Sequence, residues 1–213
     1  LFLLVDMATL CFFAHFYLLC APDKFKAMKI VAILASGEGT NAERIIRYFS
    51  YKNSVKIVLV LTNKAEAGVN RRAQNLGIPV EFVPASGFKE GKALEMLRQY
   101  QADFIVLAGF LLRIPDGILN EYPQRIVNIH PSLLPKYGGK GMYGHHVHEA
   151  VLNANEKESG ITIHYIDGQY DEGDVIFQAQ CPVLPDDTPD SLATRVHQLE
   201  YEHFPKVIEE LLA

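Results

Sequence analysis

The sequence has no tryptophan and only three cysteines among its 213 residues. Cys11, Cys20 and Cys181 have neither the spacing of a metal site nor the even number of a disulfide framework, so we expect reduced thiols and a cytoplasmic protein. Positive charge is also scarce, with 20 Lys and Arg against 25 Asp and Glu. Without a basic excess or a basic run, a nucleic-acid-binding surface is not expected.

Residues 1–27 differ from the rest of the chain, and the first twenty of them are nearly all apolar. They lack the basic n-region and cleavage site of a signal peptide. Their length is close to the roughly 20 residues of a membrane anchor, but Asp6 and His15 are costly in lipid. We expect an extension that is not part of the domain, with an anchor, a signal or an added helix as alternatives, and a single domain over residues 28–213.

From Met28 onward, short apolar runs alternate with amphipathic segments. Continuous hydrophobicity predicts strands covered on both faces at residues 29–34, 55–61, 79–83, 104–109 and 125–129. Helical periodicity is found at residues 40–50, 70–77 and 89–101. Residues 160–166 and 174–183 are predicted to form an antiparallel strand pair before a long helix at 189–212. This order predicts an α/β fold, a Rossmann-like and mostly parallel sheet flanked by helices.

The turn after the first predicted strand has the sequence ASGEGTN, residues 35–41. A glycine-rich turn that opens a helix presents backbone N–H groups and the positive end of the helix dipole, which together suit phosphate. The spacing is not that of a dinucleotide or Walker motif, so a mononucleotide-like or sugar phosphate is expected. The alternative is an ordinary turn in which Thr40 or Asn41 caps the helix.

The segment VNIHPSLLPKYGG, residues 127–139, places an amide and an imidazole two residues apart. An extended backbone aims Asn128 and His130 to the same side. Asp171 precedes Gly173 and is expected on a tight turn facing the same cleft. A carboxylate near an imidazole favours its protonated form, and the three groups suit a reaction that builds negative charge on a carbonyl oxygen. The alternatives are a structural histidine and a turn-capping aspartate.

Covalent catalysis is not favoured, because Ser132 lacks the context of an activated nucleophile. Direct attack by a substrate amine on an acyl donor fits these residues better. The chain resembles the folate-dependent formyltransferases, in particular members that act in purine synthesis. The likeness covers nearly all of residues 28–212 and is carried by SGEGTN, LAGFLLRI, NIHPSLLPKY, IHYIDGQYDEGDVI and RVHQLEYEHFP.

The resemblance implies formyl transfer from 10-formyltetrahydrofolate to the amine of glycinamide ribonucleotide, without a metal. It implies small-molecule substrates, no nucleic acid, no membrane, and a monomer or homodimer. His130 is implied as the proton donor, Asp171 as the group that raises its pKa, and Asn128 as the oxyanion partner. Other implied residues are Gly39, Thr40 and Asn41 for the phosphate; His197, Gln198, Leu199 and Glu200 for the ribonucleotide; and Leu111, Leu112, Arg113, Ile114, Asn128, Asp167, Gly168, Gln169, Tyr170 and Asp171 for the folate.

Three stretches depart from the family pattern. The segment KYGGKGMYGHHVHEAV, residues 136–151, is longer than in many relatives. We expect a mobile lid there and not a metal site at His145, His146 and His148, with His148 capping or packing the following helix. One extra residue before Arg113 leaves its folate assignment open, and the stretch near residue 90 is shortened.

Rival functions share this catalytic set. Methionyl-tRNA formyltransferase is expected to need a further RNA-binding domain, and formyltetrahydrofolate hydrolase a regulatory domain before the catalytic one. Neither is expected to carry the SGEGTN loop. A non-catalytic nucleotide-phosphate binding module is the alternative of a different class.

Overall fold

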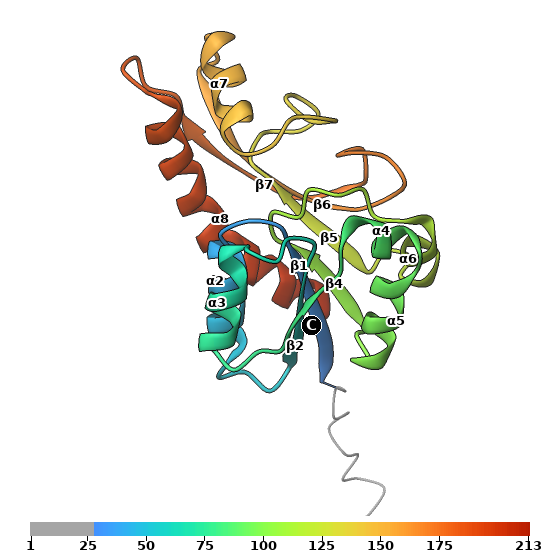
Figure 1. The fold of residues 1–213 in the computed structure, drawn as a ribbon. Coiled ribbons are helices and arrows are strands. Elements are labelled where there is room, and N and C mark those ends of the chain that lie inside the picture. Colours follow the sequence, from blue (N-terminus) through green and yellow to red (C-terminus); the bar gives the residue numbers. More distant parts are fainter. Residues whose placement is uncertain (1–27) are drawn as a thin grey trace, which may run out of the picture.

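A computed structural model describes residues 28–213, and the extension predicted at residues 1–27 lies outside the described part. A seven-stranded sheet with the order β3-β2-β1-β4-β5-β6-β7 forms its centre (Figure 1). The strands are β1 Lys29–Ala35, β2 Val55–Thr62, β3 Val80–Phe82, β4 Phe104–Leu107, β5 Ile126–His130, β6 Glu158–Tyr165 and β7 Val175–Pro182. Pairing is parallel from β3 to β5, whereas β6 is antiparallel to β5 and β7. The predicted fold class is confirmed.

Helices flank the sheet on both faces (Figure 1). They are α2 Thr40–Phe49, α3 Gly68–Asn75, α4 Ala85–Lys89, α5 Lys92–Gln99, α6 Asp116–Glu121, α7 His145–Asn153 and α8 Pro189–Leu212. The bounds predicted for the final helix are confirmed. The single helix predicted at residues 89–101 is wrong at its start, because Gly91 has a φ of 89° and separates α4 from α5.

The side chains of β1 divide between two cores, which explains its continuous hydrophobicity. Val31, Ile33 and Ala35 pack in a core with buried residues of α2, α3, α7 and α8. Ala32 and Leu34 pack on the opposite face with residues of α4, α5 and α6. The sheet is therefore held rigidly from both sides, and its strand ends are fixed in space.

The strand order reverses between β1 and β4, because the chain runs outward through β2 and β3 and returns on the other side of β1. Ligands of open parallel sheets bind beyond the carboxyl ends of the strands at such a reversal. The chain leaves β1 at Ser36, β4 at Ala108 and β5 at Pro131 along this edge. The predicted phosphate turn and the Asn128–His130 pair therefore belong to one edge of the sheet.

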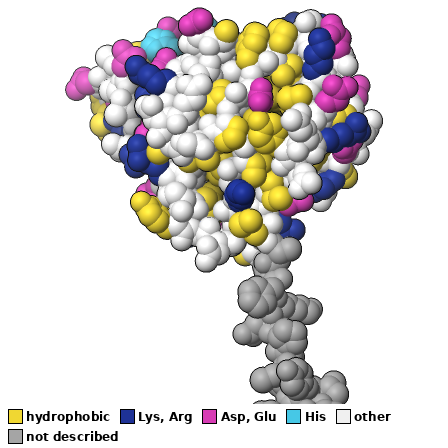
Figure 2. Space-filling model, turned by 60° about the horizontal axis from the view of Figure 1, so that its bottom comes forward, with side chains coloured by type: hydrophobic (Ala, Val, Ile, Leu, Met, Phe, Trp, Pro, Cys, Tyr) yellow, Lys and Arg dark blue, Asp and Glu magenta, His cyan; other side chains and the backbone are white. Residues whose placement is uncertain are grey.

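Surface charge is mixed on the face shown in Figure 2, where Lys and Arg side chains lie scattered among Asp and Glu. No basic stripe crosses that face. Within residues 28–213, no helix combines the length and the apolar character required to span a membrane.

Candidate active site

Two neighbouring antiparallel strands position the central polar side chains. Asn128 of β5 is the register partner of His164 on β6. The amide Nδ2 of Asn128 lies 3.1 Å from Nε2 of His164, and Nδ1 of His164 lies 2.9 Å from the carbonyl oxygen of Tyr165. Because a carbonyl oxygen only accepts, Nδ1 of His164 carries the proton and Nε2 accepts from the amide. This hydrogen bond fixes the orientation of the Asn128 side chain.

His130 lies two residues further along β5 and is 4% exposed. Its Nε2 donates to the carbonyl oxygen of Tyr137 over 2.8 Å, and its Nδ1 lies 3.6 Å from Oδ2 of Asp171. The other carboxylate oxygen of Asp171 lies 3.6 Å from Nε2 of His164. The structure thus brings Asn128, His130 and Asp171 together, with His164 between the amide and the carboxylate.

The loop after β5 contacts this cluster through residues 137–139, two of which have a positive φ. Tyr137 has a φ of 57° and Gly139 a φ of 95°. The backbone N–H of Gly139 donates to Oδ2 of Asp171 over 2.9 Å. A Cβ at Gly138 would lie 2.6 Å from Cδ2 of Leu134 and 3.2 Å from Cβ of Asp171. A side chain at position 138 would therefore displace Leu134 and crowd Asp171, and the left-handed conformation at position 139 favours glycine.

His164 was missed by sequence reasoning, which assigned its segment only to a strand. It is fully buried, and burial lowers its pKa against the opposing effect of the Asp171 carboxylate. The missing signal was register, since only the β5–β6 pairing places it opposite Asn128. Ser132, the nearest hydroxyl in sequence, donates to the carbonyl oxygen of Lys136 over 2.6 Å.

The glycine turn after β1 opens α2 without a side-chain cap. The N-cap residue is Gly39, in the left-handed region with a φ of 77°, so the alternative with Thr40 or Asn41 as N-cap is wrong. Among the residues that the structure describes, 28–213, no side chain accepts from the first-turn N–H groups at this cap. These donors and the helix dipole are therefore free for an anion.

Helix α3 holds the same turn in place. The backbone N–H of Val69 donates to the carbonyl of Gly37 over 3.1 Å, and Nε of Arg72 donates to the carbonyl of Glu38 over 2.8 Å. A Cβ at Gly39 would lie 2.5 Å from the side chain of Val69. The turn therefore follows a path that only glycine at position 39 permits.

One face of α8 meets the glycine turn. Nδ2 of Asn41 donates to Oε2 of Glu200 over 2.8 Å, and Nε2 of His197 lies 4.0 Å from the same oxygen. Glu200 is 5% exposed, and burial raises its pKa. Leu199 packs against the core and Gln198 is exposed. Of the four predicted α8 residues, His197 and Glu200 thus join the turn, and Gln198 and Leu199 do not.

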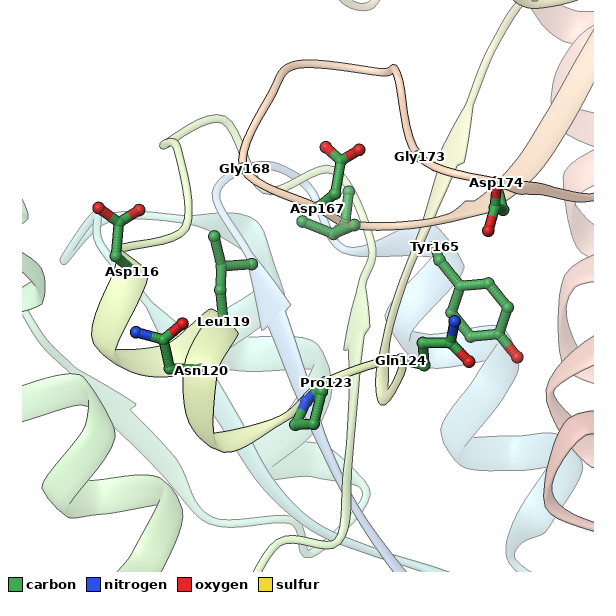
Figure 3. A pocket seen from close by; sticks show the side chains of 11 residues that line it. Asp116, Leu119, Asn120, Pro123, Gln124, Tyr165, Asp167, Gly168, Gly173 and Asp174 are labelled. Atoms are coloured by element: carbon green, nitrogen blue, oxygen red, sulfur yellow. The ribbon is translucent and has the colours of Figure 1, made fainter.

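The two segments predicted to hold a folate are joined by Arg113. Its Nε donates to the carbonyl of Gly168 over 3.0 Å, and its Nη2 lies 2.8 Å from Oδ1 of Asp116. A cavity of about 430 Å³ lies between α6 and the loop after β6 (Figure 3). Asp167 and Gly168 line it, as does Leu119 of α6. Its lining does not include Asn128, His130 or Asp171.

The three histidines after the long loop lie at the start of α7. Nδ1 of His145 lies 3.2 Å from Oε1 of Glu149, and its Nε2 lies 3.4 Å from Oδ1 of Asp190. His148 is 1% exposed and packs inward. Among residues 28–213, no three His, Cys, Asp or Glu side chains are grouped to hold a metal ion. The lid remains a prediction.

Residues 28–208 match the formyl transferase family, and the chain belongs to it. The chain is 39% identical over 188 residues to a chloroplastic phosphoribosylglycinamide formyltransferase of Arabidopsis thaliana, covering 84% of this chain and 64% of the relative. It is 36% identical over 193 residues to phosphoribosylglycinamide formyltransferase of Bacillus subtilis (strain 168), covering 87% and 95%. The chain therefore spans just under two thirds of the plant relative.

A crystal structure of phosphoribosylglycinamide formyltransferase from Anaplasma phagocytophilum superimposes with a TM-score of 0.80 at 35% identity. The superposition covers 87% of each chain. The resemblance inferred from the sequence motifs is thereby confirmed.

Proposed function

We propose that the protein transfers the formyl group of 10-formyltetrahydrofolate to the amine of 5-phosphoribosylglycinamide, a step of de novo purine synthesis. The observation that carries the proposal is the cluster of Asn128, His130, His164 and Asp171 at the carboxyl edge of the sheet. Further support comes from the names of the Arabidopsis and Bacillus relatives. We also propose that the protein is located in the cytoplasm, although the Arabidopsis relative is named as chloroplastic.

The two substrates are assigned to the two sides of this cluster. The uncapped start of α2 at Gly39–Asn41 is proposed to bind the ribonucleotide phosphate, because its N–H groups are free. Glu200 and His197 on α8 adjoin Asn41 and are proposed to bind the rest of the ribonucleotide. The segments 111–114 and 167–171 are proposed to hold the folate. Of these residues, Asp167 and Gly168 line the 430 Å³ cavity, which is large enough for a ring system.

In the proposed reaction, the neutral amine attacks the formyl carbon and a new C–N bond forms. The carbonyl oxygen becomes an oxyanion that accepts hydrogen bonds from His130 and from the amide of Asn128. The carbonyl then reforms, and the bond between the formyl carbon and N10 of the folate breaks. The proton lost by the amine passes through His130 and water to N10. Asp171 orients the His130 ring throughout.

The hydrogen bond between His130 and Tyr137 adds a condition to this scheme. Nε2 of His130 donates to the carbonyl of Tyr137, so this proton is already engaged. The oxyanion must therefore take the place of the carbonyl oxygen when both substrates are bound. We propose that the loop at residues 133–139 shifts to allow this exchange.

Replacing His130 by alanine tests the proposal. We expect His130→Ala to reduce turnover by roughly two to four orders of magnitude, because the proton donor and one oxyanion ligand are lost. The affinity for glycinamide ribonucleotide is expected to stay unchanged, because the turn at Gly39–Asn41 is untouched. Tetrahydrofolate formation and calorimetry measure the two quantities. His203→Ala is the control, since that ring packs on Phe177 with centroids 4.9 Å apart.

The same assay separates the other candidate functions. Release of formate without added ribonucleotide would support a formyltetrahydrofolate hydrolase. Ribonucleotide binding without turnover in the wild type would support a non-catalytic binding module and would refute the proposed transfer.

A further inference from the structure

Ser36 is a buried hydroxyl at the point where the strand order reverses, and it is 1% exposed. Its Oγ donates to Oδ1 of Asn63 over 2.6 Å and accepts from the backbone N–H of Leu111 over 3.1 Å. Its own backbone N–H donates to the carbonyl of Gly109 over 3.0 Å. One residue therefore ties together the chain segments that leave β1, β2 and β4.

The hydroxyl of Ser36 both donates and accepts a hydrogen bond. A serine offers one O–H donor and lone pairs that accept, and here Asn63 takes the donor and Leu111 uses the acceptor. Alanine at this position would leave the N–H of Leu111 without its acceptor, in a part-buried turn. A part-buried donor that loses its acceptor is costly, so the turn from Gly109 to Leu111 would shift to find another partner.

Each segment held by Ser36 leads to a different half of the site. The chain after Ser36 continues through Gly37 into the uncapped start of α2. The chain after Leu111 continues to Arg113, whose Nε donates to the carbonyl of Gly168 over 3.0 Å. Two hydrogen bonds, joined by the chain from Leu111 to Arg113, thus connect the glycine turn to the loop that carries Asp171.

We propose that Ser36 is a positioning residue that couples the phosphate half of the site to the folate half. The inference rests on the proposed function, because it assigns one substrate to each half. Ser36 does not touch either substrate in this proposal. Its hydroxyl sets the distance between the two binding segments, so its loss affects both substrates together.

Steady-state kinetics of Ser36→Ala with both substrates test the coupling. We expect the KM values for glycinamide ribonucleotide and for 10-formyltetrahydrofolate to rise together, each by about tenfold, with a smaller change in kcat. Ser159→Ala is the matched control. Ser159 is 2% exposed, and its Oγ has no hydrogen-bond partner in the described part of the chain. Both KM values are expected to stay unchanged in the control.

Amide hydrogen exchange gives a second readout that does not depend on turnover. Ser36→Ala is expected to raise exchange at residues 36–41 and 109–114 together. Asn63→Ala removes the acceptor of the Ser36 hydroxyl and keeps the serine. This variant replaces Ser36→Ala in the exchange measurement if Ser36→Ala does not fold. A rise in only one KM, or faster exchange in only one segment, overturns the coupling.

Lower thermal stability of Ser36→Ala with both KM values unchanged would also overturn the coupling. If the wild type lacks turnover, the proposed function fails, and the exchange data still decide whether Ser36 links the two segments.

Discussion

The two histidines of the cluster donate hydrogen bonds through different ring nitrogens. His164 donates through Nδ1 to its neighbouring carbonyl and accepts through Nε2 from Asn128, and burial lowers its pKa, so it serves as a neutral acceptor. His130 donates through Nε2 to Tyr137 and turns Nδ1 toward Asp171. The amide of Asn128 has two N–H bonds, and His164 uses one of them. The second has no partner among residues 28–213 and can donate to a developing oxyanion.

Replacing Asp171 by asparagine tests the carboxylate that both rings face. Asp171→Asn keeps the shape of the side chain and removes its negative charge. We expect kcat to fall by about a hundredfold or more, because the His130 ring loses the carboxylate that orients it. The affinity for glycinamide ribonucleotide, measured by calorimetry, is expected to stay the same.

Glu172→Gln is the control for this change, since it removes the same charge from the adjacent exposed position. We expect its kcat to match the wild type. Equal losses in the two variants would mean that the net charge of the loop matters and the carboxylate at residue 171 does not.

The sequence predicted the site residues whose polar side chains stand out from their local sequence. Asn128 and His130 were singled out by their two-residue spacing, and Asp171 by the glycine after it. The carbonyl of Tyr137, the N–H of Gly139 and the ring of His164 were not found. Two of these are backbone groups that every residue carries, and the third depends on the register of β5 with β6. Such partners are set by tertiary structure and leave no local pattern.

At the scale of elements, the glycine turn takes its shape from α3 as much as from its own sequence. Val69 and Arg72 of α3 donate hydrogen bonds to the carbonyls of Gly37 and Glu38. Arg72 also pairs with Glu43 in the first turn of α2 over 2.6 Å. The two helices therefore hold the turn between them, and its N–H groups keep their directions before any anion binds.

Gly39→Ala tests this packing. Gly39 has a φ of 77° and no room for a Cβ beside Val69, whereas Gly77 has a φ of 72° and nothing within 4 Å of its Cβ position. We expect Gly77→Ala to lower the free energy of unfolding by about 1 kcal/mol, the cost of the left-handed conformation alone. Gly39→Ala is expected to cost about 2–4 kcal/mol, because overpacking adds to it.

Urea denaturation measures both variants. The affinity for glycinamide ribonucleotide is expected to fall in Gly39→Ala only. Equal destabilisation of the two variants would show that the contact with Val69 is unimportant.

Elements with long or continuous hydrophobic patterns were predicted well, as β1, β2 and α8 illustrate. The short helices α4 and α6 were missed, since five or six residues are too few for a helical period to stand out. Antiparallel pairing of β6 with β5 was also not predicted, because only its pairing with β7 was considered. Strand neighbours are chosen by packing across the whole sheet, which short-range patterns do not record.

At the scale of the whole molecule, α8 connects the site to the stability of the domain. It packs on α2, α7 and β6, and it supplies Glu200 to the glycine turn. His148 is a buried residue of α7 that is 1% exposed, and its Nδ1 lacks a hydrogen-bond partner within residues 28–213. Burial, aided by the nearby charges of His197, His145 and His130, lowers the pKa of His148 to about 4.

This pKa makes stability depend on pH in a definite direction. In the unfolded chain the histidine has a pKa of about 6.5, so between that value and about 4 the unfolded state binds more protons than the folded state. The contribution of His148 is therefore fully present above pH 6.5 and is lost as the pH falls toward 4. The loss amounts to at most about 3 kcal/mol.

Substituting phenylalanine for His148 removes the titrating group and keeps an aromatic ring in the core. We expect the wild type to lose more unfolding free energy than His148→Phe when the pH is lowered from 7.5 to 5, because only the wild type must keep this buried imidazole neutral. Urea denaturation at the two pH values measures the difference. His146→Gln, at a ring that is 61% exposed, should retain the wild-type dependence. Identical pH profiles for wild type and His148→Phe would contradict the assignment of a low pKa to this residue.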